Sequence, residues 1–342
     1  MKRDLLEVLH CPRCGSSFRI DVLEESPKEI VTGFLECSGL WPHRYEIRRG
    51  VVCVAEGFDH ASVKREIEYL DGTYGGDARL TDPGIIGDFP DSLPLLWPGT
   101  ANFGPDFRNL IDLLPPISSR TWILDVGTAA CWTSRLLSEQ GGRVIALDVS
   151  ESDHYGLNAA DIQFEAHDVY FERILESMTH LPFRNDSIDC ITFNASLHHT
   201  PDLDRTLAEC YRTLKLGGVI GMVNESMVSL RHRFFPHENH SDTGSHHDVS
   251  YGDFEVAARR AGFSVRYYLA QHVKDRVQTT FLAPLGGLFE ATLERFPTLL
   301  KQLNSAVVIL NKAAASRPLL AGPMLEVLKP AVGIIDPKGA RG

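Results

Sequence analysis

Near the N-terminus, four side chains have the types and the spacing of a metal site. Cys11 and Cys14 are separated by two residues in CPRCGSS, and a tight turn there lets both thiolates point at one ion. Cys37, in ECSGLWPHRY, is the third ligand that we expect. His43 is favoured as the fourth because it lies in the same loop, and Cys53 is the alternative. We predict a closed, structural zinc site, because a segment this short buries too small a hydrophobic core to fold without a cross-link such as a bound metal ion.

Farther along the chain, two carboxylates end apolar runs. Asp125 closes TWILD and is followed by a turn of small residues, GTAAC. Small side chains let a backbone approach a ligand, but GTAAC lacks the glycines of a phosphate cradle, so ATP is not expected. Asp148 closes RVIALD, where a carboxylate can accept two hydroxyl hydrogens from a ribose. The alternative for Asp148 is a solvated or helix-capping aspartate.

The elements that must position these residues follow from periodicity. From Thr121 onward, strand-length runs such as TWILDV, RVIALDV, SIDCITFN and GGVIGMVN alternate with helical patterns such as CWTSRLLSEQ and LDRTLAECYRTL. This alternation predicts a parallel sheet with helices on both faces. Ligands bind at the carboxyl ends of such strands, where Asp125, Asp148 and Asn194 are expected. Before this region, FRNLIDLLPP predicts a helix that ends at Pro115 and Pro116.

Charge, apolar run length and cysteine usage disfavour three classes of protein, namely nucleic-acid-binding, membrane and secreted proteins. The formal net charge is -11 without a long basic run, so nucleic acid is not a favoured partner, although Arg44, Arg48 and Arg49 form a local basic patch. MKRDLLEVLH is not a signal peptide, and no run reaches transmembrane length, so we expect no membrane association. The 7 cysteines are odd in number and unevenly placed, which favours the cytoplasm over a secreted disulfide framework.

The N-terminal features have a family resemblance. LLEVLHCPRCGS, an extended stretch and ECSGLWPHRYEIRRGV resemble the Trm112-like zinc-ribbon family over residues 1–55. Leu40 stands where the family has its fourth cysteine, and Glu46 replaces the proline of Tyr-Pro-Ile. Either His43 substitutes as a ligand or the metal has been lost. The resemblance implies a structural or docking module, and so a protein partner through the ribbon.

A second resemblance covers about residues 118–270. LPF, a strand, LHH and LKLGG occur in the order typical of class I S-adenosylmethionine-dependent methyltransferases of the small-molecule type. This implies an α/β, Rossmann-like sheet of seven strands with helices on both faces. The family loop usually has three alternating glycines, and here Ala129 and Cys131 replace the second and third. A similar subset of the family carries Asn-Cys-Trp there, so we expect a working loop.

The resemblance also implies roles for individual residues. The methionine end of S-adenosylmethionine is expected near the loop, its ribose at Asp148 and Val149, and its adenine near the backbone of Met178. Ser177 replaces an acidic residue that often contacts the adenine. Asn194 would line the reaction centre, and His198 or His199 would act as a base, although the pair could be structural. The expected cofactor residues are Asp125, Gly127, Thr128, Ala129, Asp148, Val149, Ser177, Met178 and Asn194.

We therefore expect a zinc ribbon (1–55), a linker and helical lead-in covering the cofactor pocket (56–117), a methyltransferase domain (118–312) and a tail (313–342). The domain would contain a lid at 224–254 and a helical insertion at 274–304. The lid is rich in histidine, and a second metal there is less favoured than a solvated loop.

The expected activity is methyl transfer to a small-molecule acceptor, with an oxygen, nitrogen or carbon nucleophile left open. The alternatives are an RNA base methyltransferase with a zinc-ribbon docking module, which the acidic charge disfavours, and a non-catalytic scaffold. Ala129, Cys131 and Ser177 would be the signs of a scaffold.

Overall fold

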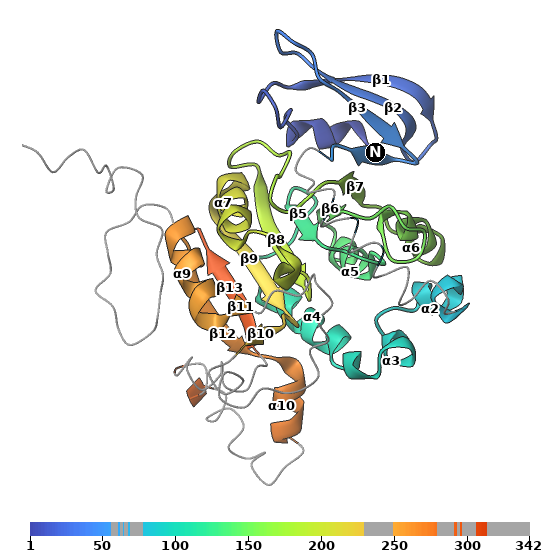
Figure 1. The fold of residues 1–342 in the computed structure, drawn as a ribbon. Coiled ribbons are helices and arrows are strands. Elements are labelled where there is room, and N and C mark those ends of the chain that lie inside the picture. Colours follow the sequence, from blue (N-terminus) through green and yellow to red (C-terminus); the bar gives the residue numbers. More distant parts are fainter. Residues whose placement is uncertain are drawn as a thin grey trace, which may run out of the picture.

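Eleven strands form one continuous sheet (Figure 1). The structure is a computed structural model that describes residues 1–55, 78–228, 249–278 and 306–312, with residues 61, 64, 68, 291, 292 and 295. The strand order is β1-β2-β3-β4-β7-β6-β5-β8-β9-β13-β12. The α/β class is as predicted. Residues 118–312 contribute seven strands to this sheet, as expected, but the whole sheet has more than seven, because β1 to β4 of the N-terminal segment join it.

The central strands have the parallel pairing that the alternating pattern predicts. They are β5 (Trp122–Val126), β6 (Arg143–Asp148), β7 (Glu172–Leu175), β8 (Ile188–Asn194) and β9 (Leu214–Val223). At the far edge β13 (Ala306–Asn311) runs antiparallel to both β9 and β12 (Ser264–Leu269). The carboxyl ends of β5 to β9 therefore meet at one edge of the sheet.

Helices cover both faces of the sheet. On one side lie α4 (Phe103–Leu113), α5 (Trp132–Glu139) and α6 (Ala160–Ala166), and on the other α7 (Leu203–Thr213) and α9 (Tyr251–Ala261). Along β5 the side chains alternate between the two apolar cores, with Leu124 in one and Ile123 in the other. The predicted helix before Pro115 is α4, which ends at Leu113.

The shorter elements complete the described chain. They are α2 (Pro83–Gly87), α3 (Leu93–Leu96), α10 (Gln271–Gln278), the 3-10 turns η1 (Arg3–Glu7), η2 (Ala78–Thr81), η3 (Pro98–Thr100), η4 (Leu157–Ala159) and η5 (Leu197–His199), and a parallel pair of β10 (Met227–Val228) and β11 (Val249–Ser250). None of the described helices is both long and apolar enough to cross a bilayer.

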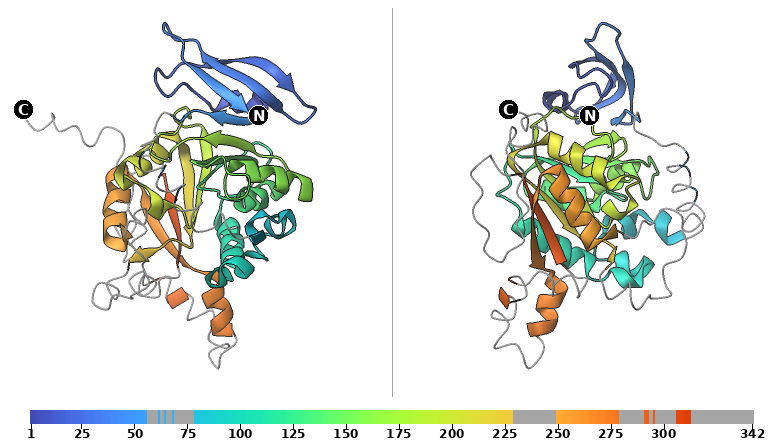
Figure 2. Two further views of the ribbon diagram at one scale, coloured as in Figure 1. Left: turned by 45° about the vertical axis from the view of Figure 1, so that its right-hand side comes forward. Right: turned by 60° about the vertical axis from the view of Figure 1, so that its left-hand side comes forward.

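The N-terminal strands are an antiparallel set that continues the central sheet (Figure 2). They are β1 (Phe18–Glu25), β2 (Ile30–Cys37), β3 (Arg44–Arg48) and β4 (Val51–Cys53). The β3–β4 turn is Arg49-Gly50, with φ of 48° and 76°, as a tight hairpin requires. Strand β4 then pairs in parallel with β7. Its residues Val51 and Val52 are fully buried, one in each apolar core.

Ion pairs join the N-terminal strands to the central domain. Arg173 on β7 is fully buried, and its two terminal nitrogens donate to Glu29 (2.7 Å) and Asp161 (2.8 Å). In the β3–β4 hairpin, Arg48 donates to Glu151, and Arg49 donates to Asp153 and to the same Asp161. The basic patch noted in the sequence is therefore largely paired within the molecule.

Two helices begin near the expected lid and helical insertion. Helix α9 begins at Tyr251, before the expected end of the lid at 254, and α10 begins at Gln271, before the expected helical insertion. Helix α9 has a local cap, because the Ser250 hydroxyl accepts a hydrogen bond from the amide of Asp253, whereas the first turn of α10 is bound by Asp106 of α4, which accepts the amide of His272. The histidines of the predicted lid, the tail 313–342, and most of 56–77 and 279–305 lie outside the described residues.

Replacement of Arg173 tests the ionic connection between the two parts. Arg173→Met leaves the carboxylates of Glu29 and Asp161 without their buried cation, so the free energy of unfolding should fall by about 3 kcal/mol. The matched change Arg260→Met breaks an exposed pair with Asp204 and should cost less than about 1 kcal/mol. Urea unfolding measures both. Equal losses of unfolding free energy in the two variants would show that the buried pairs of Arg173 contribute no more than an exposed pair.

Candidate functional site

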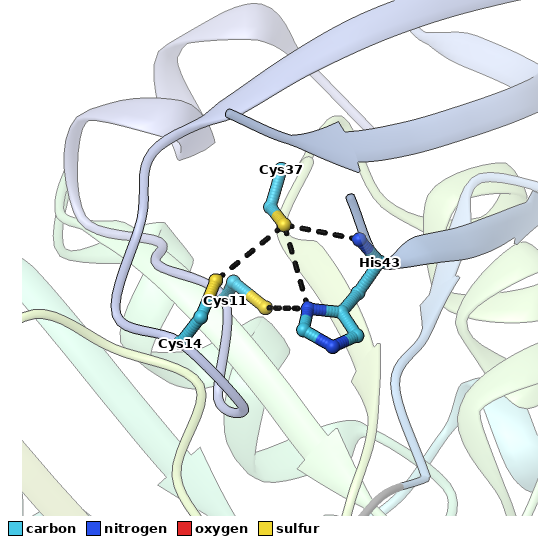
Figure 3. A group of neighbouring side chains, drawn as sticks. All are labelled: Cys11, Cys14, Cys37 and His43. Carbon is cyan, nitrogen blue, oxygen red and sulfur yellow. Dashed lines mark hydrogen bonds between the residues drawn. The ribbon is translucent and has the colours of Figure 1, made fainter. Parts of the chain in front are cut away.

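The predicted metal ligands converge in one cluster (Figure 3). The ligand atoms of Cys11, Cys14, Cys37 and His43 all lie within 4.8 Å of one another. His43 Nδ1 is 3.4 Å from Cys11 Sγ and 3.5 Å from Cys37 Sγ, and the Sγ atoms of Cys14 and Cys37 are 3.5 Å apart. Tetrahedral zinc bonds of about 2.1–2.3 Å place ligand atoms about 3.5–3.8 Å apart. The donor set and its spacing therefore fit zinc.

Local backbone contacts hold this cluster. The Gly15 amide donates to the Cys11 carbonyl (2.7 Å), which closes the turn between the first two cysteines, with φ of 70° at Gly15. The amide of His43 donates to Cys37 Sγ (3.1 Å). A hydrogen bond from the Ser16 side chain lowers the pKa of Cys14 to about 6, which favours the thiolate that a metal needs.

Cys53, the alternative ligand, lies elsewhere. Its Sγ is 3.6 Å from the Val51 carbonyl and 3.8 Å from Glu151 Oε1, at the seam with the central domain. Burial raises the pKa of this thiol to about 12, so it stays protonated. The structure thus groups His43, and not Cys53, with the other three ligands.

The loop after β5 adopts an unusual backbone at alternate residues. Gly127, Ala129 and Cys131 have φ of 71°, 43° and 60°. These are the three positions at which the loop of class I methyltransferases, which this sequence resembles, usually has glycine. A left-handed conformation costs a residue with a Cβ roughly 1–2 kcal/mol. The loop therefore keeps the backbone of a glycine loop although two of the three glycines are replaced, and strain of this kind is typical of functional sites.

Asp125 supports this loop from inside the protein. Its carboxylate is fully buried and accepts hydrogen bonds from Thr133 (2.6 Å) and Ser134 (2.7 Å) of α5 and from Thr192 (2.8 Å) of β8. Burial raises the pKa of Asp125, and the hydroxyl donors oppose that shift. The sequence predicted a residue beside the methionine end of the cofactor. The side chain instead ties α5 and β8 to β5.

Two further contacts hold the loop. Asp148 at the end of β6 accepts hydrogen bonds from the amides of Ala129 and Ser150, both at 3.0 Å. Trp132, directly after the loop, packs edge-on against Phe107 of α4, with ring centroids 5.4 Å apart. The predicted loop and the predicted carboxylate are therefore in contact. Ala129 is exposed, whereas Thr128 is buried and Val149 is half-buried.

The segment after β7 lies beside Asp148. Ser177 is buried, and its hydroxyl pairs with that of Thr179 (2.8 Å), whereas Met178 is half-buried. Glu176, which was not predicted, is fully buried and accepts a hydrogen bond from the Ser177 amide (2.7 Å). An acidic residue directly after the strand ERIL was the available signal.

Two residues that follow β9 and were not predicted, Asn224 and Glu225, bind two predicted residues, Asn194 and His198. Asn194 Oδ1 accepts a hydrogen bond from Asn224 Nδ2 (2.8 Å). His198 Nδ1 lies 2.9 Å from Glu225 Oε2, and both side chains are buried. The ring of His199 lies 4.3 Å from that of His198.

Glu225 binds more than the imidazole. Its carboxylate also accepts the backbone amides of Ser196, Leu197 and His198, at 3.0 to 3.2 Å. Although burial opposes ionisation, the bonds from His198 and these amides lower the pKa of Glu225 below its usual value. An ionised carboxylate therefore orients His198. The sequence signal was the strand end VNE, where two polar residues follow a buried run.

Part of the chain is similar to known methyltransferases. Residues 124–222 match a family model described as a methyltransferase domain. A malonyl-[acyl-carrier protein] O-methyltransferase from Hamiltonella defensa is 30% identical over 112 residues, which cover 33% of this chain and 41% of the relative. A demethylmenaquinone methyltransferase from Listeria monocytogenes is 32% identical over 118 residues, which cover 33% of this chain and 48% of the relative. The chain therefore spans less than half the length of these relatives.

Among solved structures, a complex that contains the Haloferax volcanii Trm112 methyltransferase activator aligns with 18% identity and a TM-score of 0.46, over 68% of this chain and 97% of that chain. Similarity this low carries no functional conclusion. The family match covers residues 124–222, and both relatives are named as methyltransferases.

Two substitutions test the strained loop. Ala129→Gly relieves the left-handed strain at an exposed position, so we expect unfolding free energy to stay level or rise by up to about 1 kcal/mol. Gly127→Ala should lower it by at least about 2 kcal/mol, because a Cβ there would lie 2.5 Å from the Ser196 Cβ. Urea unfolding compares the two. A loss on Ala129→Gly equal to that of Gly127→Ala would contradict the strained-loop interpretation.

Proposed function

We propose that this chain is an S-adenosylmethionine-dependent methyltransferase that acts on a small-molecule acceptor. One observation supports this most strongly. The loop of the matched domain keeps left-handed backbone at residues 127, 129 and 131, and its Ala129 amide is bound to Asp148 at the end of the next strand. A decayed scaffold has no reason to keep a strained backbone after losing its glycines.

Particular residues would hold the cofactor. Gly127, Thr128 and Ala129 would border its methionine end, with Asp125 positioning the loop from beneath. The ribose would lie at Asp148 and Val149, and the adenine near Ser177 and Met178. When bound, S-adenosylmethionine supplies a methyl group already activated by a sulfonium. The protein has to position the acceptor and manage its proton.

The side chains after β8 and β9 suit that task. Asn224 holds Asn194, and Glu225 orients His198, so the predicted reaction centre has fixed side chains. His198 would then act as a base or bind the acceptor. A small acceptor is the class that the two relatives suggest, since their names specify an acyl-carrier-bound malonyl group and a demethylmenaquinone.

The RNA alternative is less well supported. Arg48 and Arg49 form ion pairs with Glu151, Asp153 and Asp161 within the molecule, so they are not available as a basic strip for phosphates. We propose instead that the ribbon holds a structural zinc ion and that its strands stabilise the β7 edge of the catalytic sheet.

Titration calorimetry with S-adenosylmethionine and S-adenosylhomocysteine tests the cofactor site. The wild-type protein should bind both. Asp148→Asn removes one of the two acceptor oxygens for the ribose, so the Kd should rise at least about tenfold. Asp153→Asn, at an exposed position in the segment that follows β6, is the matched control and should change the Kd less than about twofold. Absence of binding to the wild type would favour the scaffold.

Metal analysis of the purified protein tests the ribbon. We expect about one zinc per chain, and loss of that zinc with unfolding of the ribbon in Cys37→Ser and in His43→Ala. Cys53→Ser should keep the metal, because Cys53 lies outside the cluster. Loss of zinc in Cys53→Ser but not in His43→Ala would overturn the ligand assignment.

A further inference from the structure

We infer that the pocket beyond the end of β9 receives the methyl acceptor, that this acceptor is a neutral molecule with a hydroxyl group on an apolar body, and that His272, positioned by Asp106, takes the hydroxyl proton. This inference rests on the proposed function. Neither His272 nor Asp106 was among the residues expected from the sequence.

The pocket combines an apolar wall with a few polar groups. Met222 and Met227 are among its apolar lining residues. Its polar lining residues are Asp106 of α4, Asn224 and Glu225 after β9, Tyr251 of α9 and His272 of α10. Apolar walls with a small number of placed polar groups are typical of sites for small organic ligands.

Asp106 and His272 form a close pair. Asp106 is 1% exposed, and its Oδ2 lies 2.6 Å from His272 Nδ1. Its Oδ1 accepts the backbone amide of His272 (2.9 Å), so one carboxylate fixes both the start of α10 and the orientation of the ring. When Nδ1–H donates to Asp106, the basic lone pair is on Nε2, and the carboxylate stabilises the imidazolium that forms on protonation.

The pocket adjoins the predicted reaction centre. Asn224 lines it and donates to Asn194, and Glu225 lines it and holds His198. The two residues that follow β9 thus line the pocket and also bind Asn194 at the end of β8 and His198 just after it. An acceptor in this pocket would therefore lie next to the expected position of the methyl group.

The charge of the lining selects the acceptor. Asp106 and Glu225 are carboxylates, each hydrogen-bonded to one imidazole, so each pair is net negative while its imidazole is neutral. An acceptor with a free carboxylate would be repelled there, whereas a neutral hydroxyl can donate to an imidazole nitrogen. Met222 and Met227, with the lining valines Val223 and Val308, would then contact the apolar body of the molecule.

Methyl transfer needs only the acceptor hydroxyl, the cofactor and His272. The hydroxyl oxygen forms the new bond to the methyl carbon, the sulfur–carbon bond breaks with its electron pair left on sulfur, and the hydroxyl proton passes to His272. The products are a methyl ether and S-adenosylhomocysteine. General-base assistance of this kind contributes about 10²–10⁴-fold in rate.

A purely structural role is the alternative for Asp106, since it binds the first turn of α10. Asp106→Asn separates the two. The amide oxygen can still accept the His272 backbone amide, but the negative charge beside the ring and the pocket is lost. A structural role predicts no change in acceptor selectivity.

The test uses two probes with one aromatic skeleton, 1-naphthol and 1-naphthoic acid, near neutral pH, where the first is neutral and the second ionised. Each is titrated into the full-length protein saturated with S-adenosylhomocysteine. Wild type should bind 1-naphthol at least about tenfold more tightly than 1-naphthoate. His272→Gln should weaken 1-naphthol binding about fivefold or more, and Asp106→Asn should reduce the preference for 1-naphthol by strengthening 1-naphthoate binding.

The controls separate this inference from the proposed function. His167→Gln, a histidine that contacts the Gly87 carbonyl away from the pocket, should behave as wild type with both probes. All variants should bind S-adenosylhomocysteine within about twofold of wild type. Failure of wild type to bind S-adenosylhomocysteine would overturn the proposed function. Normal S-adenosylhomocysteine binding with no 1-naphthol binding, a preference for 1-naphthoate, or unchanged selectivity in both variants would overturn the acceptor pocket alone.

Discussion

The backbone between β5 and α5 runs through three left-handed residues, two of which carry a Cβ. Such a path persists only if its surroundings hold it. Asp125 accepts hydrogen bonds from α5 and β8, and Asp148 accepts one from the Ala129 amide. Trp132 packs edge-on against Phe107 of α4. The positions of the residues proposed to hold the cofactor, and through Ser196 the start of the loop after β8, depend on this one bend.

Much of this arrangement was predictable because the signals are local. The apolar runs that became β5, β6 and β8 place Asp125, Asp148 and Asn194 at their ends, and the Cys11–Cys14 spacing indicates the ribbon ligands. What depends on distant segments was not predictable. Strand β4 has only three residues, too few for a periodic pattern, and its pairing with β7 joins residues more than a hundred positions apart. The Asp106–His272 pair joins two helices far apart in sequence. Strand alternation turns the buried Asp125 toward α5, and its hydrogen bonds to α5 and β8 were likewise not predicted.

The edge of the sheet where the carboxyl ends of β5 to β9 meet differs in chemistry between its two ends. Around β5 and β6, backbone amides and a small-residue loop predominate, which suits close approach of a ligand to the main chain. Around β9, α4 and α10, imidazoles paired with carboxylates predominate, which suits handling of a proton. The hydrogen bond between Asn194 and Asn224 connects these regions across the ends of β8 and β9.

Strand β4 also has a consequence for how the protein can be divided. It occupies the edge of β7 with parallel hydrogen bonds, and β7 is a short, wholly buried strand. A fragment beginning after the ribbon would leave those amides and carbonyls open beside apolar side chains, and such an edge recruits strands from other molecules. The central domain is therefore expected to self-associate when it is separated from the N-terminal strands, because β4 covers the edge of β7 that would otherwise pair with other molecules.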